Sequence, residues 1–353
     1  METLMRGSVA SGRARRRCVA GGVLFALTSV PSHWRGAAAQ QTQRTWVPGS
    51  WTVVTSLAAN RNLLAAPGNL ACSGSALYTY DYGDHALKAL SLTGAPLWRV
   101  PDRAAFHADS AVVSRVEVSP NGDVWMTRPN MGHIAVFSPA GTPVRTFTGI
   151  RNIREVQVNR DGSFWAWRDL ETMPELRDSA GALRRKLPSS ARVQPVDWLT
   201  ASGTLASGAD GALAVAYTYS NRFLIVRRGG TSVHAFRGVG EPRTAPKLKG
   251  ETLTIGARRI TGFRPAPGTR IVAMAVSVDA DHLYILRGDD STASPQHDRT
   301  VDSYRMSDGS YTGSYLLPDA VEELCVHDGE FIATTAASPP ALRVWRFAPG
   351  NVR

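Results

Sequence analysis

Charged and amide side chains recur at alternate positions in front of several tight-turn signals, and they are the residues best placed to bind a ligand or a metal. They stand five or seven residues before Gly74, Gly122, Gly162 or Gly329 and are Asn69, Arg115, Glu117, Glu155, Gln157 and Glu322. Residues two apart in a strand point to the same side, so the set converges wherever such strands surround one axis. Buried carboxylates need a cationic partner or a metal. The alternatives are therefore a binding site in a channel and an Arg115–Glu155 ion pair surrounded by channel water.

A second group of candidates is basic and lies between Gly238 and Thr269. This stretch contains six basic and two acidic residues, a density that suits phosphate, carboxylate or an acidic polymer. The anion-binding candidates within it are Lys247, Lys249, Arg258 and Arg259. The alternative is a solvated loop whose charges only keep the protein soluble.

Familiar catalytic signatures are missing from the sequence. Residues 40–353 contain seven His at no spacing typical of zinc, and no nucleophile elbow, phosphate-binding loop or Cys-x-x-Cys occurs. We therefore predict no cofactor, and a divalent metal in the channel remains the alternative.

The elements that must position these residues repeat along the chain. The segment VEVSPNGDVWMTR from Val116 corresponds to VQVNRDGSFWAWR from Val156 at an offset of 40 residues. The same frame recurs around Gly74, Gly211, His282 and Gly329. Each copy has alternating apolar residues, a turn signal and an aromatic or β-branched run, which is typical of a β-hairpin.

A second glycine signal follows each first turn after 19 to 27 residues, so each unit holds four antiparallel strands. Six such units without a convincing helix predict an all-β fold, a six-bladed β-propeller. The predicted blades lie near residues 63–100, 108–149, 150–190, 191–238, 265–318 and 319–350.

The last unit predicts how the ring closes. It stops at Gly350 and lacks a fourth strand, which would expose an edge of unpaired backbone groups. The segment Thr45 to Leu57 has strand composition and no other partner. We predict that this N-terminal strand closes the propeller as the outer strand of the last blade.

The repeat resembles that of six-bladed propellers of the NHL-repeat type, and residues 116–147 match it best. The resemblance implies an architecture but no single function, because such propellers include sensor ectodomains, scaffolds, lyases and lactonases. A lactonase-like site would need Glu, Asn and Asp around a divalent ion, and the residues of suitable type are Glu322, Asn69, Asn152 and Asp197. The segment ALSLTGAPLWR, residues 89–99, also looks like one copy of the Trp-docking repeat of quinoprotein propellers.

Strand direction separates the two faces of the predicted propeller. All the glycine turns lie on one face, which we call the turn face, and the other connections form the loop face. The two longest connections, 238–269 and 288–300, both belong to the loop face. Long loops on a rigid scaffold commonly carry function, so we expect ligand recognition there.

The N-terminus is typical of an export signal. Four Arg between positions 13 and 17 precede an apolar run of 13 residues from Cys18 to Val30, which is too short to span a bilayer. Ala37 to Ala39 then fit the small-residue rule for signal peptidase. We predict that residues 1–39 are a cleaved signal peptide and that the mature chain, 40–353, is secreted or periplasmic without a stable membrane span.

The mature chain contains two cysteines, Cys72 and Cys325, in the innermost strands of the first and last blades. An oxidising compartment favours a disulfide between such a pair. Counted from Gly74 and Gly329, however, the two residues lie two and four positions before their turns. This difference in depth favours two buried free thiols.

Together these patterns predict an exported binding module or scaffold that recognises a protein, peptide or anionic ligand on its loop face. Nucleic acid is not expected, because the mature chain has 34 basic and 28 acidic residues and no concentrated basic stripe. The alternative is a lyase- or lactonase-like enzyme with a divalent metal at the channel mouth.

Overall fold

A computed structural model describes the structure of the protein. The described residues are 43–58, 63–102, 113, 115–128, 132–168, 173–187, 202–208, 210–240, 248–255, 258–265, 269, 271–288, 296 and 298–350, and for 248–255 and 258–265 the backbone alone. All of them belong to one compact unit, Gln40–Arg353. Among these residues, no helix has the length and apolar character needed to cross a membrane.

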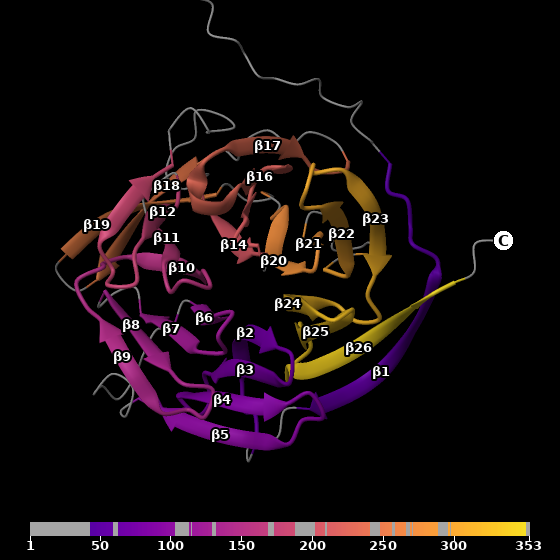
Figure 1. Ribbon diagram of the computed structural model, residues 1–353, viewed down its shortest axis with the longest axis horizontal. Helices are drawn as coiled ribbons and strands as arrows, with labels where there is room; N and C mark the ends of the chain where they lie inside the picture. Colours follow the sequence, from indigo (N-terminus) through magenta and orange to yellow (C-terminus); the bar gives the residue numbers. More distant parts are fainter. Residues whose placement is uncertain are drawn as a thin grey trace, which may run out of the picture. The chain divides into compact units, whose positions relative to one another are not determined.

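Six four-stranded antiparallel sheets surround a common axis, as Figure 1 shows. The first three blades are β2 (Pro67–Ser73), β3 (Ala76–Asp81), β4 (Ala86–Ser91), β5 (Pro96–Pro101); β6 (Arg115–Val118), β7 (Val124–Arg128), β8 (His133–Phe137), β9 (Pro143–Phe147); and β10 (Ile153–Val158), β11 (Phe164–Arg168), β12 (Glu175–Arg177), β13 (Leu183–Lys186). The next two are β14 (Gly203–Ser207), β15 (Leu213–Tyr217), β16 (Arg222–Val226), β17 (Val233–Arg237); and β20 (Ala273–Asp279), β21 (His282–Arg287), β22 (Thr300–Arg305), β23 (Tyr311–Leu316). The sixth is β24 (Val321–His327), β25 (Glu330–Thr335), β26 (Ala341–Pro349) and β1 (Gly49–Ala58). The predicted all-β, six-bladed propeller is confirmed.

Closure by an N-terminal strand is also confirmed. Strand β1 pairs antiparallel with β26, from Gly49 opposite Pro349 to Ala58 opposite Ala341. The predicted strand began too early, because Thr45 and Val47 instead bond to Ser314 in the fifth blade. Pro48, which has no N–H to donate, stands where the chain passes from one blade to the next.

The innermost turns are of two lengths, and this explains why some repeats are degenerate in sequence. In the second and third blades, three-residue loops end in Gly122 and Gly162 at φ 86° and 77°, the left-handed conformation that such loops require. In the first and last blades, two-residue turns connect Ser73 to Ala76 and His327 to Glu330. A glycine alignment therefore places the strands of different blades one residue out of register.

The core lies between neighbouring blades. Because both faces of each sheet are covered, the middle strands are apolar at nearly every position, and β7 and β15 are buried along their whole length. Trp125 contacts Phe147 and Phe164 with ring centroids 5.2 Å apart in each case, which joins the second blade to the third. The tryptophan of the repeat therefore holds blades together and does not face a ligand.

A hydrogen bond from the outermost strand of one blade to the second turn of the next blade repeats on the turn face, and we call this contact the latch. Trp98 in β5 donates its indole N–H to the Pro139 carbonyl at 2.8 Å, and Arg145 in β9 makes the equivalent bond to the Ser179 carbonyl. Each acceptor belongs to the second turn of the next blade. Arg185 continues the pattern toward Gly229 and Gly230 at 2.9 Å, so the one Trp-docking-like copy seen in the sequence belongs to a series in which arginine replaces tryptophan.

This latch predicts a large difference between two glycine substitutions. Gly141 and Gly149 have similar φ values of 77° and 80°, so alanine at either site costs about 1 kcal/mol of backbone strain. An added Cβ at Gly141 would lie 2.7 Å from the Trp98 ring, whereas at Gly149 it would meet nothing within 4 Å. We expect Gly141→Ala to lower the free energy of unfolding by about 2 kcal/mol more than Gly149→Ala, measured by urea denaturation. Equal losses would show that the ring packing does not depend on this glycine.

The predicted pair of free thiols is wrong. Cys72 and Cys325 form a disulfide with their Cα atoms 6.1 Å apart, within the normal range for such a bond. The predicted difference in depth was too large because Gly74 opens its two-residue turn, whereas Gly329 ends one. Measured from the last paired residues, Ser73 and His327, the cysteines differ by one position.

Candidate functional site

The axial channel contains a cavity of about 500 Å³ at its turn-face end. The innermost strands of all six blades line it, together with turn residues such as Gly74, Gly122 and Gly208. The sequence predicted the recognition site on the loop face. This cavity opens at the opposite face, between the tight turns that end the innermost strands.

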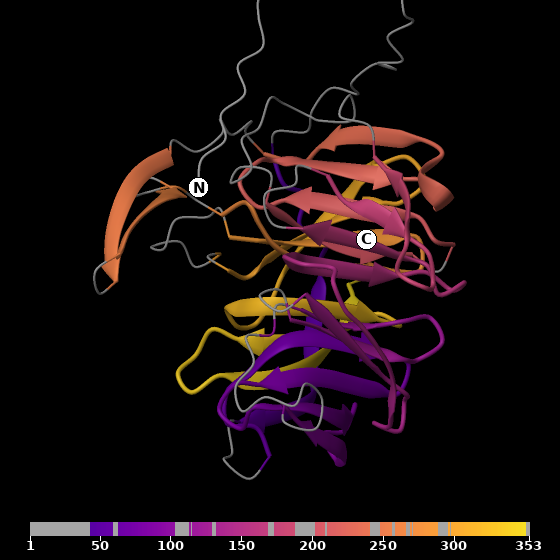
Figure 2. The ribbon, with the colours of Figure 1, turned by 90° about the vertical axis from the view of Figure 1, so that its left-hand side faces the viewer.

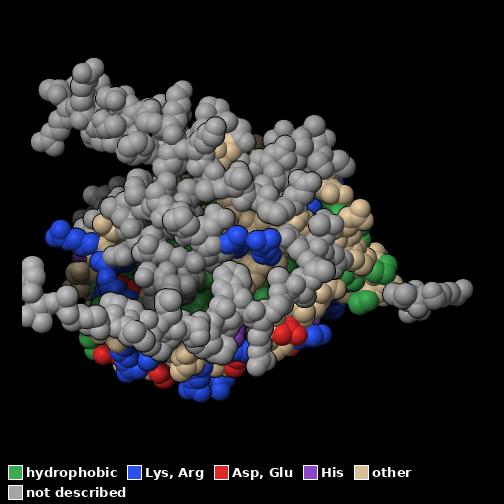
Figure 3. All heavy atoms as spheres, turned by 90° about the horizontal axis from the view of Figure 1, so that it is seen from above, with side chains coloured by type: hydrophobic (Ala, Val, Ile, Leu, Met, Phe, Trp, Pro, Cys, Tyr) green, Lys and Arg blue, Asp and Glu red, His purple; other side chains and the backbone are tan. Residues whose placement is uncertain are grey.

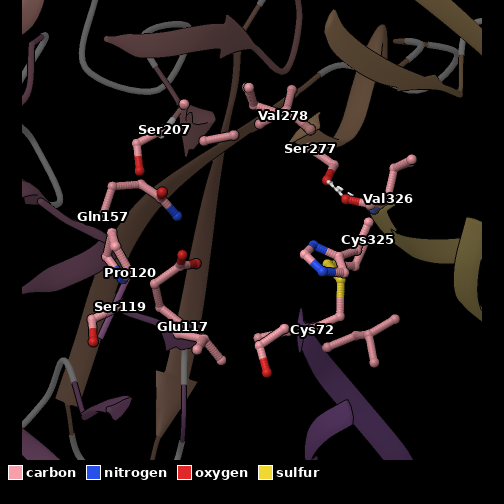
Figure 4. A pocket seen from close by; sticks show the side chains of 18 of the residues that line it. Cys72, Glu117, Ser119, Pro120, Gln157, Ser207, Ser277, Val278, Cys325 and Val326 are labelled. Atoms are coloured by element: carbon pink, nitrogen blue, oxygen red, sulfur yellow. Dashed lines mark hydrogen bonds between the residues drawn. A yellow bond between two sulfur atoms is a disulfide. The ribbon is translucent and has the colours of Figure 1, made fainter. Parts of the chain in front are cut away.

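The walls of this turn-face cavity are part polar and part apolar (Figure 4). Glu117 from β6 and Gln157 from β10 lie on one side with Ser207 from β14, and the Cys72–Cys325 disulfide lies on the opposite side. Gln157 is 3% exposed. The cavity therefore has one side with the Glu117 carboxylate and the Gln157 amide, and another with the disulfide, Ser277 and His327.

Arg115 connects the cavity to the deeper part of the channel. Its guanidinium lies 3.6 Å from Glu117 and 3.6 Å from Glu155, so the ion pair predicted for Arg115 and Glu155 is present but long for a hydrogen bond. The two facing atoms, Arg115 Nε and Glu155 Oε2, are buried without a hydrogen-bond partner. One guanidinium thus forms long ion pairs with two carboxylates and lies within hydrogen-bond distance of neither.

Burial dominates the titration of these acids. It raises the pKa of Glu117 to about 7, against the opposing effects of Arg115 and of a hydrogen bond from Gln157. Burial also raises the pKa of Glu155 and of Glu323, and Arg115 opposes the shift in both. Strongly displaced acids in a cavity are typical of functional sites.

Glu322 does not occupy the channel, and Glu323 takes the place predicted for it. A bulge between Val321 and Glu323 shifts the alternation of β24, so Glu322 is exposed. The Glu323 carboxylate accepts hydrogen bonds from the N–H groups of Asn69, at 2.6 Å, and Leu70. It therefore ties the last blade to the first.

Asn69 serves the same junction on the loop-face side of the cavity. Its side-chain amide donates to the hydroxyl of Tyr82 at 2.5 Å and to the Val113 carbonyl. Asn69 is thus engaged within the protein and, like Glu323, stabilises ring closure.

The basic stretch forms a separate two-stranded antiparallel sheet, β18 (Leu248–Ile255) and β19 (Arg258–Pro265). Figure 2 draws this hairpin standing apart from the blades. Lys249 lies in β18, and Arg258 and Arg259 open β19, whereas Lys247 lies outside the described residues. The connection between β17 and β20 therefore carries a basic hairpin, as its composition allowed.

The residues suggested for a lactonase-like metal site have different surroundings. Asn69 is engaged with Tyr82, Asn152 is an exposed turn residue, and Asp197 lies outside the described residues. Within the described part of the chain, the group of acidic and His side chains close enough to share an ion is Asp279, His327 and Asp328, at the turn face.

Sequence reasoning missed several residues of the cavity wall. Ser207, Ser277 and His327 all line it, but serines at strand ends carry no motif. The glycine alignment also put β24, which has a two-residue turn, out of register with β6, β10 and β14, which have three-residue turns.

Comparison with known proteins gives a fold and no family. No family model and no curated protein matches the chain. The structure of selenomethionine-substituted virginiamycin B lyase from Staphylococcus aureus is similar, with 14% identity, a TM-score of 0.51, and coverage of 84% of this chain and 99% of that one. A streptogramin B lyase structure has 11% identity and a TM-score of 0.51 over 87% of this chain and 100% of that one. A catalytically inactive form of the staphylococcal lyase with quinupristin has 13% identity and a TM-score of 0.52 over 84% of this chain and 99% of that one. At such low identities the likeness shows the propeller fold alone.

Proposed function

We propose that this chain is an exported binding module that takes a small polar ligand into the turn-face cavity of its axial channel. The volume of about 500 Å³ lies in the range of small-molecule sites. The observation that carries the proposal is the Glu117 carboxyl group, which is buried in the wall of that cavity with a pKa of about 7. Propellers use their rigid rings for many functions, so the proposal rests on this site and not on the fold.

The proposal predicts that a side chain that fills the cavity abolishes ligand capture. The protein is purified from the medium or periplasm of its native host, where we expect a chain that begins near Gln40, and is incubated with a small-molecule extract of that host. We expect mass spectrometry to find compounds retained by the parent and lost from Ser207→Trp, because an indole at Ser207 occupies the cavity. Ser56→Trp, on the exposed outer strand β1, is the matched control and should retain them. Identical capture by the parent and Ser207→Trp would contradict the proposal.

An enzyme of the lyase or lactonase kind with a divalent metal is the alternative function. The Asp279, His327 and Asp328 group beside the cavity supports it in part, since one His and two carboxylates are suitable ligands for a divalent ion. Metal analysis of the same preparation separates the two functions. Bound metal at one equivalent, lost in Asp279→Asn, would favour the enzyme.

The loop face offers a second candidate site, favoured by the separate β18–β19 hairpin. We propose that this hairpin attracts a protein, peptide or other anionic partner. In the view of Figure 3, the described Lys and Arg side chains form several separate patches with Asp and Glu among them.

For this hairpin we predict a loss of anion binding without a loss of stability. Replacing Lys247, Lys249, Arg258 and Arg259 together with Ser should leave the melting temperature nearly unchanged, because the hairpin belongs to no blade of the propeller. Retention on an anionic resin at low salt should disappear, since salt-screened attraction depends on those charges. If the variant and the parent elute at the same salt concentration, the hairpin is not an anion-binding site.

A further inference from the structure

The charge of the turn-face cavity indicates which ligands it prefers. Among the described residues that line it, Glu117 is the carboxylate, Arg115 and His327 are the other ionisable groups, and the remaining polar side chains are hydroxyls and amides. In Figure 4 the Glu117 side chain points into the open space between Gln157 and the disulfide. A ligand in the cavity therefore meets a carboxylate first.

Arg115 cannot neutralise this carboxylate fully. The guanidinium is held 3.6 Å from Glu155 as well as 3.6 Å from Glu117, and the charge of Glu323 also acts on it. Arg154 contributes a second positive charge on the side of Glu155. Three partly buried carboxyl groups thus share two cations, and the cationic partner of the one that faces the cavity lies 3.6 Å away, beyond hydrogen-bond distance.

We propose that the ligand of this cavity is a protonated amine that also carries hydroxyl groups, an amino alcohol or amino sugar. This inference rests on the proposed function of the cavity. The ammonium group binds the Glu117 carboxylate at the short distance that Arg115 does not reach, and such charge-assisted bonds are the stronger ones. The hydroxyl groups bind the amide of Gln157 and the hydroxyl of Ser207, which lie on the same side of the cavity.

Other ligand classes fit these walls less well. An anion would meet Glu117 and displace Arg115 from its acids, at a cost in buried charge. A calcium ion requires six to eight oxygen ligands with several carboxylates, and the cavity wall offers one carboxylate.

The inference has a pH signature because Glu117 must be ionised to hold an ammonium group. The groups that bear on its ionisation are Arg115 on its own strand, Gln157 and Glu155 on β10, and Glu323 on β24 through Arg115. With a pKa of about 7 for Glu117, the ionised fraction falls about tenfold between pH 8 and pH 6. The affinity for an amine that stays protonated throughout should fall by about the same factor.

The test compares three probes that share one carbon skeleton: glucamine (1-amino-1-deoxy-D-glucitol), which is cationic, D-glucitol, which is neutral, and D-gluconate, which is anionic. We expect calorimetry on the mature protein at pH 8 to show glucamine binding at least tenfold more tightly than the other two. Glucamine affinity should fall about tenfold at pH 6, with a proton released on binding. In Glu117→Gln the affinity should be at least tenfold weaker and should no longer depend on pH.

Three results would overturn the inference: glucitol or gluconate binding as tightly as glucamine, no binding of glucamine, or glucamine binding that Ser207→Trp leaves intact. The parent's own pH dependence keeps the test decisive if Glu117→Gln does not fold. Host compounds captured by the cavity but neutral or anionic would leave the proposed function standing and remove this inference alone. Failure of the capture experiment would remove both.

Discussion

Deletion of residues 45–57 should lower the melting temperature of the protein sharply and cause it to self-associate. The segment contains most of β1, whose Trp51 packs 5.0 Å from Phe331 and 4.8 Å from Phe347 between ring centroids. The Trp51 indole also donates to the Leu316 carbonyl at 2.8 Å in the fifth blade. Loss of a fully buried aromatic residue costs about 3–5 kcal/mol; Trp51 is partly buried and contributes less, but loss of the strand adds an unpaired sheet edge.

The deleted strand also joins the sixth blade to the first. Thr55 donates its hydroxyl to the Leu92 carbonyl at 2.6 Å, and Leu57 packs where a Cβ on Gly94 would lie. Calorimetry and light scattering measure the effect of the deletion, and a synthetic peptide of residues 45–57 added in trans should restore part of the melting temperature. A truncated protein that stays monomeric with an unchanged melting temperature would show that closure does not depend on this strand.

Replacement of Cys72 and Cys325 by Ala together should lower the free energy of unfolding by about 2–4 kcal/mol, which corresponds to roughly 3–6 °C in melting temperature for a chain of this size. The disulfide spans 253 positions in sequence, so its loss removes a constraint on the conformational freedom of most of the unfolded chain. A reducing agent should lower the melting temperature of the parent to that of the variant and leave the variant unchanged.

Thiol titration checks the same bond without a mutation. The denatured, unreduced mature protein should show no titratable thiols, because its two cysteines are joined. Two titratable thiols in a monomer would contradict the disulfide and remove its contribution to closure.

The fold followed from the sequence because a propeller repeats its signals. Alternating apolar residues and glycine turns recur six times, and the missing fourth strand of the last blade identified the N-terminal segment as its partner. The register of the innermost strands was harder to predict, because two-residue and three-residue turns both contain glycine and look alike in the sequence. That ambiguity led to the wrong prediction for Cys72 and Cys325. Together with the bulge between Val321 and Glu323, it also put Glu322 in the place that Glu323 occupies.

The candidate site was predictable in part. Arg115, Glu117, Glu155 and Gln157 were selected by their alternation on β6 and β10, two blades whose turns have the same length. The turn-face cavity was not predictable, because the length of the connections pointed to the loop face and the volume of a cavity depends on how the six blades assemble. The serines of the cavity wall have small side chains and no motif, so only the assembled ring brings them together.

The central claim is that the turn-face end of the channel is the ligand site, and a crystal structure of the mature protein with a captured host compound tests it most directly. The account predicts density for the compound inside the cavity, within hydrogen-bond distance of Glu117 and Gln157. Density for the compound on the loop face or against the β18–β19 hairpin, with water alone between Glu117 and the disulfide, would contradict it.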